Sequence, residues 1–220
     1  MNYYPMIFND AMVAAILAGD KTQTRRPIAS ANSLVDGYPG ARVWGDLDFG
    51  GAWIDPGPSP AGNPGPYLKT RRPADETRHR VYSRVQPGDF LWVREAWAEG
   101  ADGYVYRASA PDAAPKWRPS IHMPRRASRI LLEVEAVWPE RLRDISESDA
   151  YYEGVKPVEC DVHSQIFKTH KWLYRYRDGF RALWDSIYAA RGLGQDADPW
   201  VWVYGFGVLD CELDGGRGCR

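Results

Sequence analysis

A stretch rich in glycine and proline limits the architecture of this chain more than any other feature. Between Gly37 and Pro66, 14 of 30 residues are Gly or Pro, and such a stretch supports neither a long helix nor an interior strand. It still carries large apolar side chains, namely Val43, Trp44, Leu47, Phe49, Trp53 and Ile54. We therefore expect a loop insertion over about residues 28–78, either with a short hairpin around Gly50–Gly51 laid against the main fold or acting as a mobile lid.

The remainder of the chain has the pattern of short strands with a few short helices. Alternating β-branched and aromatic residues predict strands over 1–8, 80–85, 90–97, 104–107, 130–138 and 200–206. We expect 80–85 and 90–97 to form a hairpin through Pro87-Gly88-Asp89, and 130–138 to lie centrally in a sheet. At 220 residues the chain fits one α+β domain over 1–209, followed by a flexible tail over 210–220.

Three helices are predicted from their end signals and their apolar spacing. The first runs over about 10–18, with Asn9 or Asp10 as N-cap and Gly19 after its end. The second follows the capping box Ser146-Glu147-Ser148-Asp149 and reaches Glu153, where Gly154 ends it. The third runs from about Gly179 to Ala190, with Asp178 as its cap.

Charge and cysteine content restrict the environment and the ligands. The formal net charge is -1, but residues 21–130 contain 17 Lys and Arg against 11 Asp and Glu. A basic middle favours a local anionic ligand over a long duplex, although a mixed-sign solubilising surface gives the same pattern. The odd count of three cysteines predicts a reducing cytoplasm, and the absence of a long apolar run predicts no membrane span.

We expect neither a metal nor a cofactor. Cys160, His163 and His170 lie in one segment, but they supply only three ligands at a spacing that matches no known zinc site. The chain also contains no Gly-x-Ser-x-Gly elbow and no dinucleotide-binding glycine pattern after a strand.

The turn after the first predicted helix concentrates reactive and basic side chains. Lys21 lies in the turn, where we expect it to be exposed, and an extended segment follows it. In that segment Thr22, Thr24 and Arg26 share one face, whereas Gln23 and Arg25 share the other. A phosphate-binding loop is excluded, because that motif needs a glycine directly before the lysine and a helix after it.

A second candidate region combines bases with aromatic rings. The segment 116–129 has two prolines and no helical or strand period, so we predict a structured loop. Guanidinium groups hold phosphates and a flat ring stacks on a base. The candidate contacts are Trp117, Arg118, His122 and Arg125 from the loop, with Arg94, Glu95 and Trp97 from the strand before it; for the tryptophans, core packing is the alternative.

The pattern Gly-x-Lys-Thr-x-Thr-x-Arg at residues 19–26, after a short helix, resembles the signature of the ASCH family (activating signal cointegrator homology, PUA-like). The loop 116–129 and Trp92-Val93-Arg94-Glu95 resemble the larger, phage-associated branch of that family. The resemblance implies a small mixed β-barrel with a few short helices and long loop insertions.

The resemblance also implies a reaction. Some small ASCH members are amidohydrolases that remove the acetyl group of N4-acetylcytidine with a lysine, a threonine and a glutamate, which match Lys21, Thr24 and Glu153. A neutral lysine can take the proton of the threonine hydroxyl, which then attacks the acyl carbon. Burial, or a charge such as Arg25 or Arg26, must lower the lysine pKa for this step, and Glu95 competes with Glu153 as the carboxylate.

The alternative is binding without catalysis. In that case the ligand is single-stranded RNA or a modified base, with Lys21 and Arg26 on phosphate and Trp117 or Trp97 stacked on a base. Both hypotheses stay open at the level of sequence.

Overall fold

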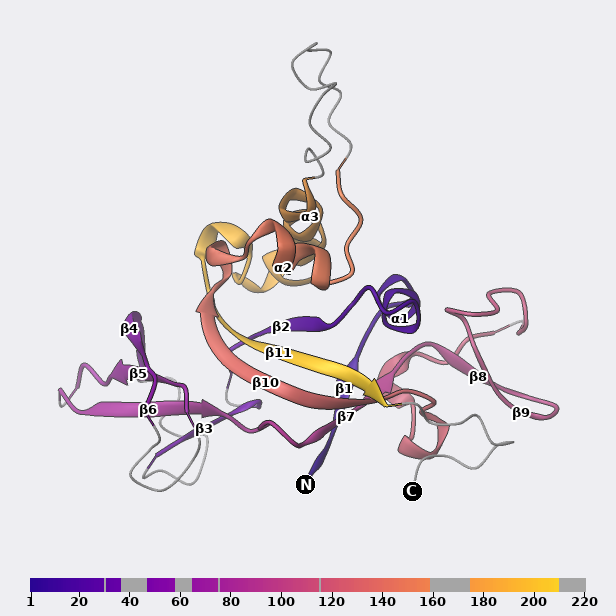
Figure 1. The fold of residues 1–220 in the computed structure, drawn as a ribbon, viewed down its shortest axis with the longest axis horizontal. Helices are drawn as coiled ribbons and strands as arrows, with labels where there is room; N and C mark the ends of the chain where they lie inside the picture. Colours follow the sequence, from indigo (N-terminus) through magenta and orange to yellow (C-terminus); the bar gives the residue numbers. More distant parts are fainter. Residues whose placement is uncertain are drawn as a thin grey trace, which may run out of the picture.

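The computed structural model describes residues 1–29, 31–36, 47–57, 65–74, 76–114, 116–158 and 175–209. The described chain is an α+β fold, mostly strands, with three α-helices. In Figure 1 a central sheet is flanked by a second sheet at one end and by a two-stranded hairpin at the other, while α2 and α3 lie together above the central sheet. The predicted tail over 210–220 and the candidate metal residues Cys160, His163 and His170 lie outside the described residues.

The central sheet has five strands in the order β1-β7-β10-β11-β2. Their bounds are Tyr3–Ile7 for β1, Phe90–Arg94 for β7, Leu131–Arg141 for β10, Trp200–Leu209 for β11 and Gln23–Pro27 for β2. β1 runs parallel to β7, and the other neighbours are antiparallel. The predicted central position of the strand at 130–138 is confirmed, because β10 lies between β7 and β11.

The predicted small mixed β-barrel is not closed in the described chain. No ladder joins the edge strands β1 and β2 among the described residues, so the sheet is open. The helix α1, Asp10–Leu17, follows β1 almost directly and packs Met12, Val13 and Ile16 into the core cluster that the sheet strands share. The Arg26 side chain on β2 donates a hydrogen bond to the Ile7 carbonyl of β1. This side-chain contact is not part of a backbone ladder.

The described part of the predicted insertion is a folded sheet. Its antiparallel strands β3 (Ser33–Val35), β6 (Arg78–Ser83), β5 (Tyr67–Arg71) and β4 (Asp48–Asp55) are paired in that order. The predicted hairpin between 80–85 and 90–97 is therefore wrong, because β6 pairs with β3 and β5. The predicted turn at Gly50–Gly51 is also wrong, since both glycines lie within β4, at the place where its register with β5 shifts.

A smaller hairpin follows β7. Its strands β8, Trp97–Gly100, and β9, Gly103–Tyr106, pair as the turn signal at Asp102-Gly103 predicts. The predicted strand 90–97 is interrupted at Glu95 and Ala96, between β7 and β8. The loop that follows contains two 3-10 turns, η2 (Ser120–His122) and η3 (Arg125–Ala127), as expected for a segment without a helical or strand period.

The helices begin and end largely where their signals predict. Asn9 caps α1 by accepting a hydrogen bond from the Met12 backbone nitrogen. The helix α2, Glu147–Tyr152, has the predicted capping box between Ser146 and Asp149. The helix α3, Tyr176–Tyr188, begins before the predicted cap Asp178, which lies in its first turn and pairs with Arg175 instead.

The remaining short turns are η4 (Leu142–Asp144), η6 (Ala189–Arg191) and η7 (Gln195–Ala197). A second core cluster lies beneath α2 and α3 and includes Ala150, Phe180, Trp184, Val201 and Val203. No helix in the described part of the chain is long and apolar enough to cross a membrane.

Candidate functional site

Lys21 points into the protein where α1 turns into β2. Gly19 adopts φ +79°, a conformation that favours glycine, and Lys21 N donates to the carbonyl of Ala15 at 3.1 Å. The Lys21 side chain is buried, with 1% of its surface exposed. The expected exposed position is therefore wrong, because the turn directs this lysine toward the end of α2.

Three oxygens surround the Lys21 ammonium group. Nζ donates to Glu153 Oε2, to the Glu153 carbonyl and to the Gln23 carbonyl, each at 2.7 Å. Three acceptors match the three hydrogens of a protonated lysine. The arrangement satisfies a charged lysine and leaves it no free hydrogen.

Glu153 follows α2 at a point where two backbones meet closely. The next residue, Gly154, has φ +72°, and a Cβ placed on it would lie 2.7 Å from Ala15 Cβ and 2.8 Å from Lys21 Cβ. Thr22 N also donates to the Tyr152 carbonyl at 3.0 Å. A glycine at position 154 therefore allows the end of α2 to dock on the start of β2, which brings Glu153 to Lys21.

Arg25 extends this contact into a buried charge network. The sequence analysis considered Arg25 only as a neighbouring charge that could lower the pKa of Lys21. Its Nη1 donates to Glu153 Oε1 at 3.1 Å, and its Nε donates to Glu140 Oε1 at 2.6 Å. Glu140 also accepts a hydrogen bond from Trp138 Nε1 at 3.2 Å. Arg25 is 1% exposed. Two cations and two carboxylates are thus joined beneath α2.

Burial and the neighbouring carboxylates act in opposite directions on the pKa of each cation. Burial lowers the pKa of Lys21 to about 8, against the attraction of Glu153 and with a smaller lowering from Arg26 and Arg25. Burial also disfavours the charge of Arg25, but Glu153 and Glu140 outweigh it and raise the Arg25 pKa. Arg25 therefore stays charged, whereas Lys21 approaches a pKa at which a neutral fraction exists near neutral pH.

Thr24 and Arg26 form a separate contact on the other face of β2. Thr24 is fully buried, and its Oγ1 accepts a hydrogen bond from Arg26 Nη1 at 2.8 Å. The Phe8 ring lies 5.3 Å from Arg26 Cζ and 5.7 Å from Lys21 Nζ. The structure therefore brings Lys21 and Glu153 together, while no hydrogen bond joins Thr24 to either of them in the described chain.

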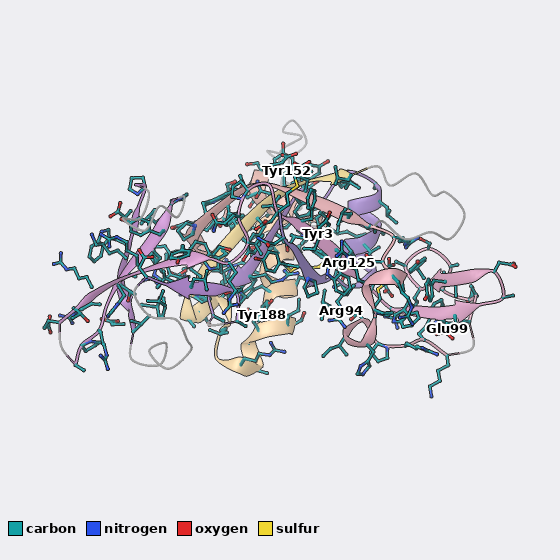
Figure 2. The ribbon with its side chains drawn as sticks, turned by 90° about the horizontal axis from the view of Figure 1, so that it is seen from below. Tyr3, Arg94, Glu99, Arg125, Tyr152 and Tyr188 are labelled. Atoms are coloured by element: carbon teal, nitrogen blue, oxygen red, sulfur yellow. The ribbon has the colours of Figure 1, made fainter. Side chains whose placement is uncertain are left out.

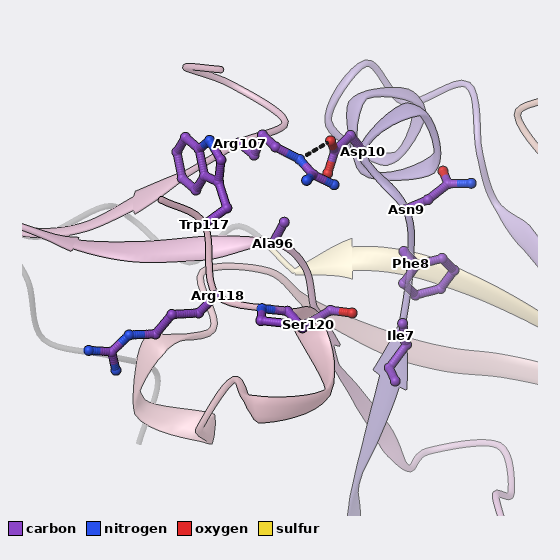
Figure 3. A pocket seen from close by; sticks show the side chains of 10 residues that line it. Ile7, Phe8, Asn9, Asp10, Ala96, Arg107, Trp117, Arg118 and Ser120 are labelled. Carbon is purple, nitrogen blue, oxygen red and sulfur yellow. Dashed lines mark hydrogen bonds and ion pairs between the residues drawn. The ribbon is translucent and has the colours of Figure 1, made fainter. Parts of the chain in front are cut away.

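A cavity of about 370 Å³ lies beside Phe8 (Figure 3). Its lining comes from the end of β1, the start of α1, the link between β7 and β8, and the loop after β9. It consists of Ile7, Phe8, Asn9, Asp10, Ala96, Arg107, Trp117, Arg118, Pro119 and Ser120. Phe8 therefore lines the cavity, and the charged groups of Lys21 and Arg26 lie near its ring. Lys21, Thr24 and Glu153 do not line this cavity.

The polar groups of the cavity are unevenly satisfied. Arg107 Nε donates to Asp10 Oδ2 at 2.6 Å, the contact drawn in Figure 3. The second oxygen, Asp10 Oδ1, is buried and has no hydrogen-bond partner among the described residues. Buried carboxylate oxygens are normally hydrogen-bonded. Because Oδ1 is closed to solvent, the Asp10 carboxylate takes part in the cavity through its pair with Arg107.

The candidates Glu95, between β7 and β8, and Trp97, on β8, have structural partners. Glu95 is fully buried and forms two hydrogen bonds with Arg129, each 2.9 Å long. Burial raises the pKa of Glu95 and Arg129 opposes the rise. Trp97 is 2% exposed and packs edge-on against Tyr104, so the core-packing interpretation applies to it.

The remaining candidates lie outside the cavity, except Trp117 and Arg118. Arg125 stacks on Tyr3 with its Cζ 3.9 Å from the ring centroid, and Arg94 lies over Trp92 and donates to the carbonyl of Ile121. Figure 2 shows Tyr3, Arg125 and Arg94 in one region of the surface. His122 is exposed. Within the described residues, no group of three His, Cys, Asp or Glu side chains is arranged to hold a metal ion.

Comparisons with known proteins give one structural match. No family model matches the chain, and no curated protein matches it either. Among solved structures, the chain matches the crystal structure of an ASCH domain from Lactobacillus crispatus JV V101, at 14% identity and a TM-score of 0.38, over 94% of this chain and 79% of that one. The match is to the family that the motif at residues 19–26 resembles. At this identity and TM-score it assigns no activity and no residue roles.

Proposed function

We propose that this chain is an ASCH-type domain that binds a pyrimidine nucleoside, free and modified or within single-stranded RNA, in the cavity beside Phe8. The observation that carries the proposal is a cavity of about 370 Å³ that combines Trp117 and the Asp10–Arg107 pair with apolar walls. Sites for small ligands usually have volumes of about 300–1,000 Å³ and combine apolar walls with a few polar groups.

The lining offers each type of contact that a nucleoside needs. Trp117 supplies a ring on which a base can stack, and Ile7, Phe8 and Ala96 supply apolar walls. The Asp10 carboxylate, which pairs with Arg107 through Oδ2, can accept a hydrogen bond from a base amino group. Arg118, an exposed residue paired with Glu99 at 3.1 Å, lies where a phosphate can exchange with that carboxylate.

Binding is favoured over catalysis by the state of the three residues that the family motif implies. Lys21, Thr24 and Glu153 are each at most 2% exposed. The Lys21 hydrogens and the Thr24 oxygen already have partners within the protein. Their first role in this proposal is to fix the turn after α1, and thereby the position of Phe8 at the cavity wall.

Trp117→Ala is expected to weaken nucleoside binding by about 5- to 150-fold, because one stacked base contributes about 1–3 kcal/mol. Titration calorimetry with cytidine, N4-acetylcytidine and a short single-stranded RNA would measure the loss. Tyr151→Ala is the matched control, since Tyr151 is an exposed aromatic residue on α2 outside the cavity. Equal affinities for Trp117→Ala and Tyr151→Ala would contradict the proposal, as would a wild-type protein that binds none of the three ligands.

An amidohydrolase is the second candidate, and the observation in its favour is the pKa of about 8 for a lysine in contact with Glu153. Neutral Lys21 would take the hydroxyl proton of Thr24, whose oxygen would attack the acyl carbon of an N4-acylated cytidine. The C–N bond would then break, Lys21 or Glu153 would return the proton to the leaving amine, and water would hydrolyse the acyl-threonine. Phe8 would have to move for a substrate to reach Thr24.

In the hydrolase case, Lys21→Met should abolish release of acetate from N4-acetylcytidine, measured by chromatography. Lys156→Met is the matched control, because Lys156 is an exposed lysine after α2. Glu95→Gln should keep activity, since the Glu95 carboxylate is held by Arg129 away from this network. Product at the wild-type rate from folded Lys21→Met would exclude the lysine as base, and no product from the wild type would leave only the binding proposal.

A further inference from the structure

One face of the second sheet carries an unusual arrangement of charge. The strand registers place Trp53 opposite Lys69, Lys69 opposite Arg80, and Arg71 opposite Arg78. Directly paired residues of antiparallel strands share a face. We call the face formed by Trp53, Lys69, Arg71, Arg78 and Arg80 the basic face.

Like charges on the basic face oppose each other across the ladder between β5 and β6. Lys69 faces Arg80 and Arg71 faces Arg78, and like charges directly opposite in a sheet destabilise it. The register is fixed from the other side, where Leu68 and Val81 are fully buried. The fold therefore holds four cations together, although it gains no stability from their proximity.

Carboxylates neutralise the basic face only in part. Asp55 lies 3.5 Å from Lys69, and Glu76 lies 3.0 Å from Arg71. Arg80 Nε donates to the Tyr67 hydroxyl at 3.0 Å, and Arg78 has no ion pair with any residue that the structure describes. Asp36 and Asp55 act on Arg80 by charge, and Asp48 lies opposite Arg71. Among the described residues, Arg78 is therefore the cation of this face without a close carboxylate, and it is the contact point for an anionic partner.

An exposed tryptophan lies among these cations. Trp53 is 42% exposed on β4, and its ring centroid lies 5.7 Å from Lys69 Nζ and 5.6 Å from Arg78 Cζ. A large exposed aromatic residue on a sheet surface offers a π-face to a base, and cations on either side offer contacts to the adjoining phosphates. Neighbouring strands are about 4.8 Å apart, so the face from β4 to β6 extends about 10 Å across the strands.

We infer that the basic face binds single-stranded nucleic acid, with a base stacked on Trp53 and phosphates held by Lys69, Arg71, Arg78 and Arg80. A single strand is favoured over a duplex, because only an unstacked base can lie on the Trp53 ring. This surface belongs to the insertion and shares no residue with the cavity beside Phe8. The inference does not depend on the nucleoside site.

The test is binding of the full chain to a fluorescein-labelled 12-nucleotide oligouridine, followed by anisotropy between 50 and 200 mM salt. Removing two phosphate contacts with Lys69→Ala/Arg78→Ala should weaken binding and reduce the slope of log affinity against log salt by about 1.4, because each contact to a single strand contributes about 0.7. Lys156→Ala/Arg191→Ala is the matched control, since it removes one exposed lysine and one exposed arginine elsewhere.

Trp53→Ala is the second variant, and it should weaken binding by about 5- to 150-fold without changing the salt slope, as expected for a lost stacking contact. Circular dichroism on each variant shows whether the fold is retained. Three outcomes would overturn the inference. They are no binding by the wild type at 50 mM salt, an unchanged slope in the Lys69→Ala/Arg78→Ala variant, and binding to phosphatidylserine vesicles or poly-aspartate but not to the oligonucleotide.

Discussion

Replacing Glu153 with alanine is expected to lower the free energy of unfolding by about 3–5 kcal/mol, the usual loss when one member of a buried ion pair is removed. Glu153 holds two cations at once, because Oε2 accepts from Lys21 Nζ at 2.7 Å and Oε1 from Arg25 Nη1 at 3.1 Å. Both cations are 1% exposed, so water does not replace the lost carboxylate. Urea unfolding followed by tryptophan fluorescence would measure the change.

Two further variants make this result specific. Glu135→Ala removes an exposed carboxylate from β10, and it should change stability by less than about 0.5 kcal/mol. Glu153→Gln keeps the shape and one acceptor but loses the charge, so its cost should fall between the other two. If Glu153→Ala were as stable as Glu135→Ala, the network would not be what joins α2 to β2.

The structural importance of Glu153 also affects how activity data can be interpreted. The carboxylate that the family motif assigns to catalysis is the one that compensates Lys21 and Arg25 inside the protein. Loss of turnover in Glu153→Ala would follow from disorder of this network whether or not Glu153 takes part in chemistry. Lys21→Met is the better probe of catalysis, because it removes a buried charge and leaves Glu153 paired with Arg25.

The elements that sequence alone predicted best depend on local interactions. The cap at Asn9, the capping box of Ser146 and Asp149, and the positive φ of Gly19 and Gly154 each involve backbone groups within a few residues. The central strand β10 was equally clear, because it is long and apolar in alternation. Such signals do not require knowledge of the partner strand.

The pairings that were predicted wrongly depend on contacts between distant segments. Pro87-Gly88-Asp89 has the residues of a hairpin turn, yet Asp89 uses Oδ2 to accept from Gln86 N at 3.0 Å and Oδ1 to accept from Asn2 N at 2.8 Å. The second contact places β7 beside β1. The alternation of β6 fits either β7 or β5 as its partner, and a period of two does not distinguish them.

The candidate site was predicted in part for the same reason. The motif at 19–26 pointed to Lys21 and, through the resemblance, to Glu153, and these two side chains do meet. The sequence analysis required burial of Lys21 only for the catalytic hypothesis and otherwise placed it in an exposed turn, and it missed the pairing of Arg25 with Glu153, because charged residues in a turn or on a short strand are usually exposed. Only the docking of α2, through the close approach at Gly154, encloses both cations.

Stability should also depend on pH through Lys21. Burial lowers the pKa of this lysine from its ordinary value of 10.5 to about 8. Between these values the unfolded chain binds more protons than the folded protein, so stability rises as the pH increases from 8 toward 10.5. At pH 9.5 the gain relative to pH 7 should be about 2 kcal/mol, because one unit of pKa shift corresponds to about 1.4 kcal/mol.

Three tyrosines limit the useful range. Burial raises the pKa of Tyr4, Tyr106 and Tyr204, the last to about 12. Above a pH of about 10 the unfolded chain therefore loses tyrosine protons that the folded protein keeps, and stability falls. Measurements at pH 7 and pH 9.5 avoid most of this opposing effect.

Lys21→Met should remove the rise with pH, since methionine has similar length and does not titrate. Relative to Lys21→Met, the wild type is expected to become about 2 kcal/mol more stable between pH 7 and pH 9.5. Lys156→Met, which alters an exposed lysine, should show no such shift. If the difference in stability were independent of pH, Glu153 would be offsetting the full cost of burying Lys21, and the lysine would keep an ordinary pKa. The neutral lysine that the hydrolase candidate requires would then not form near neutral pH.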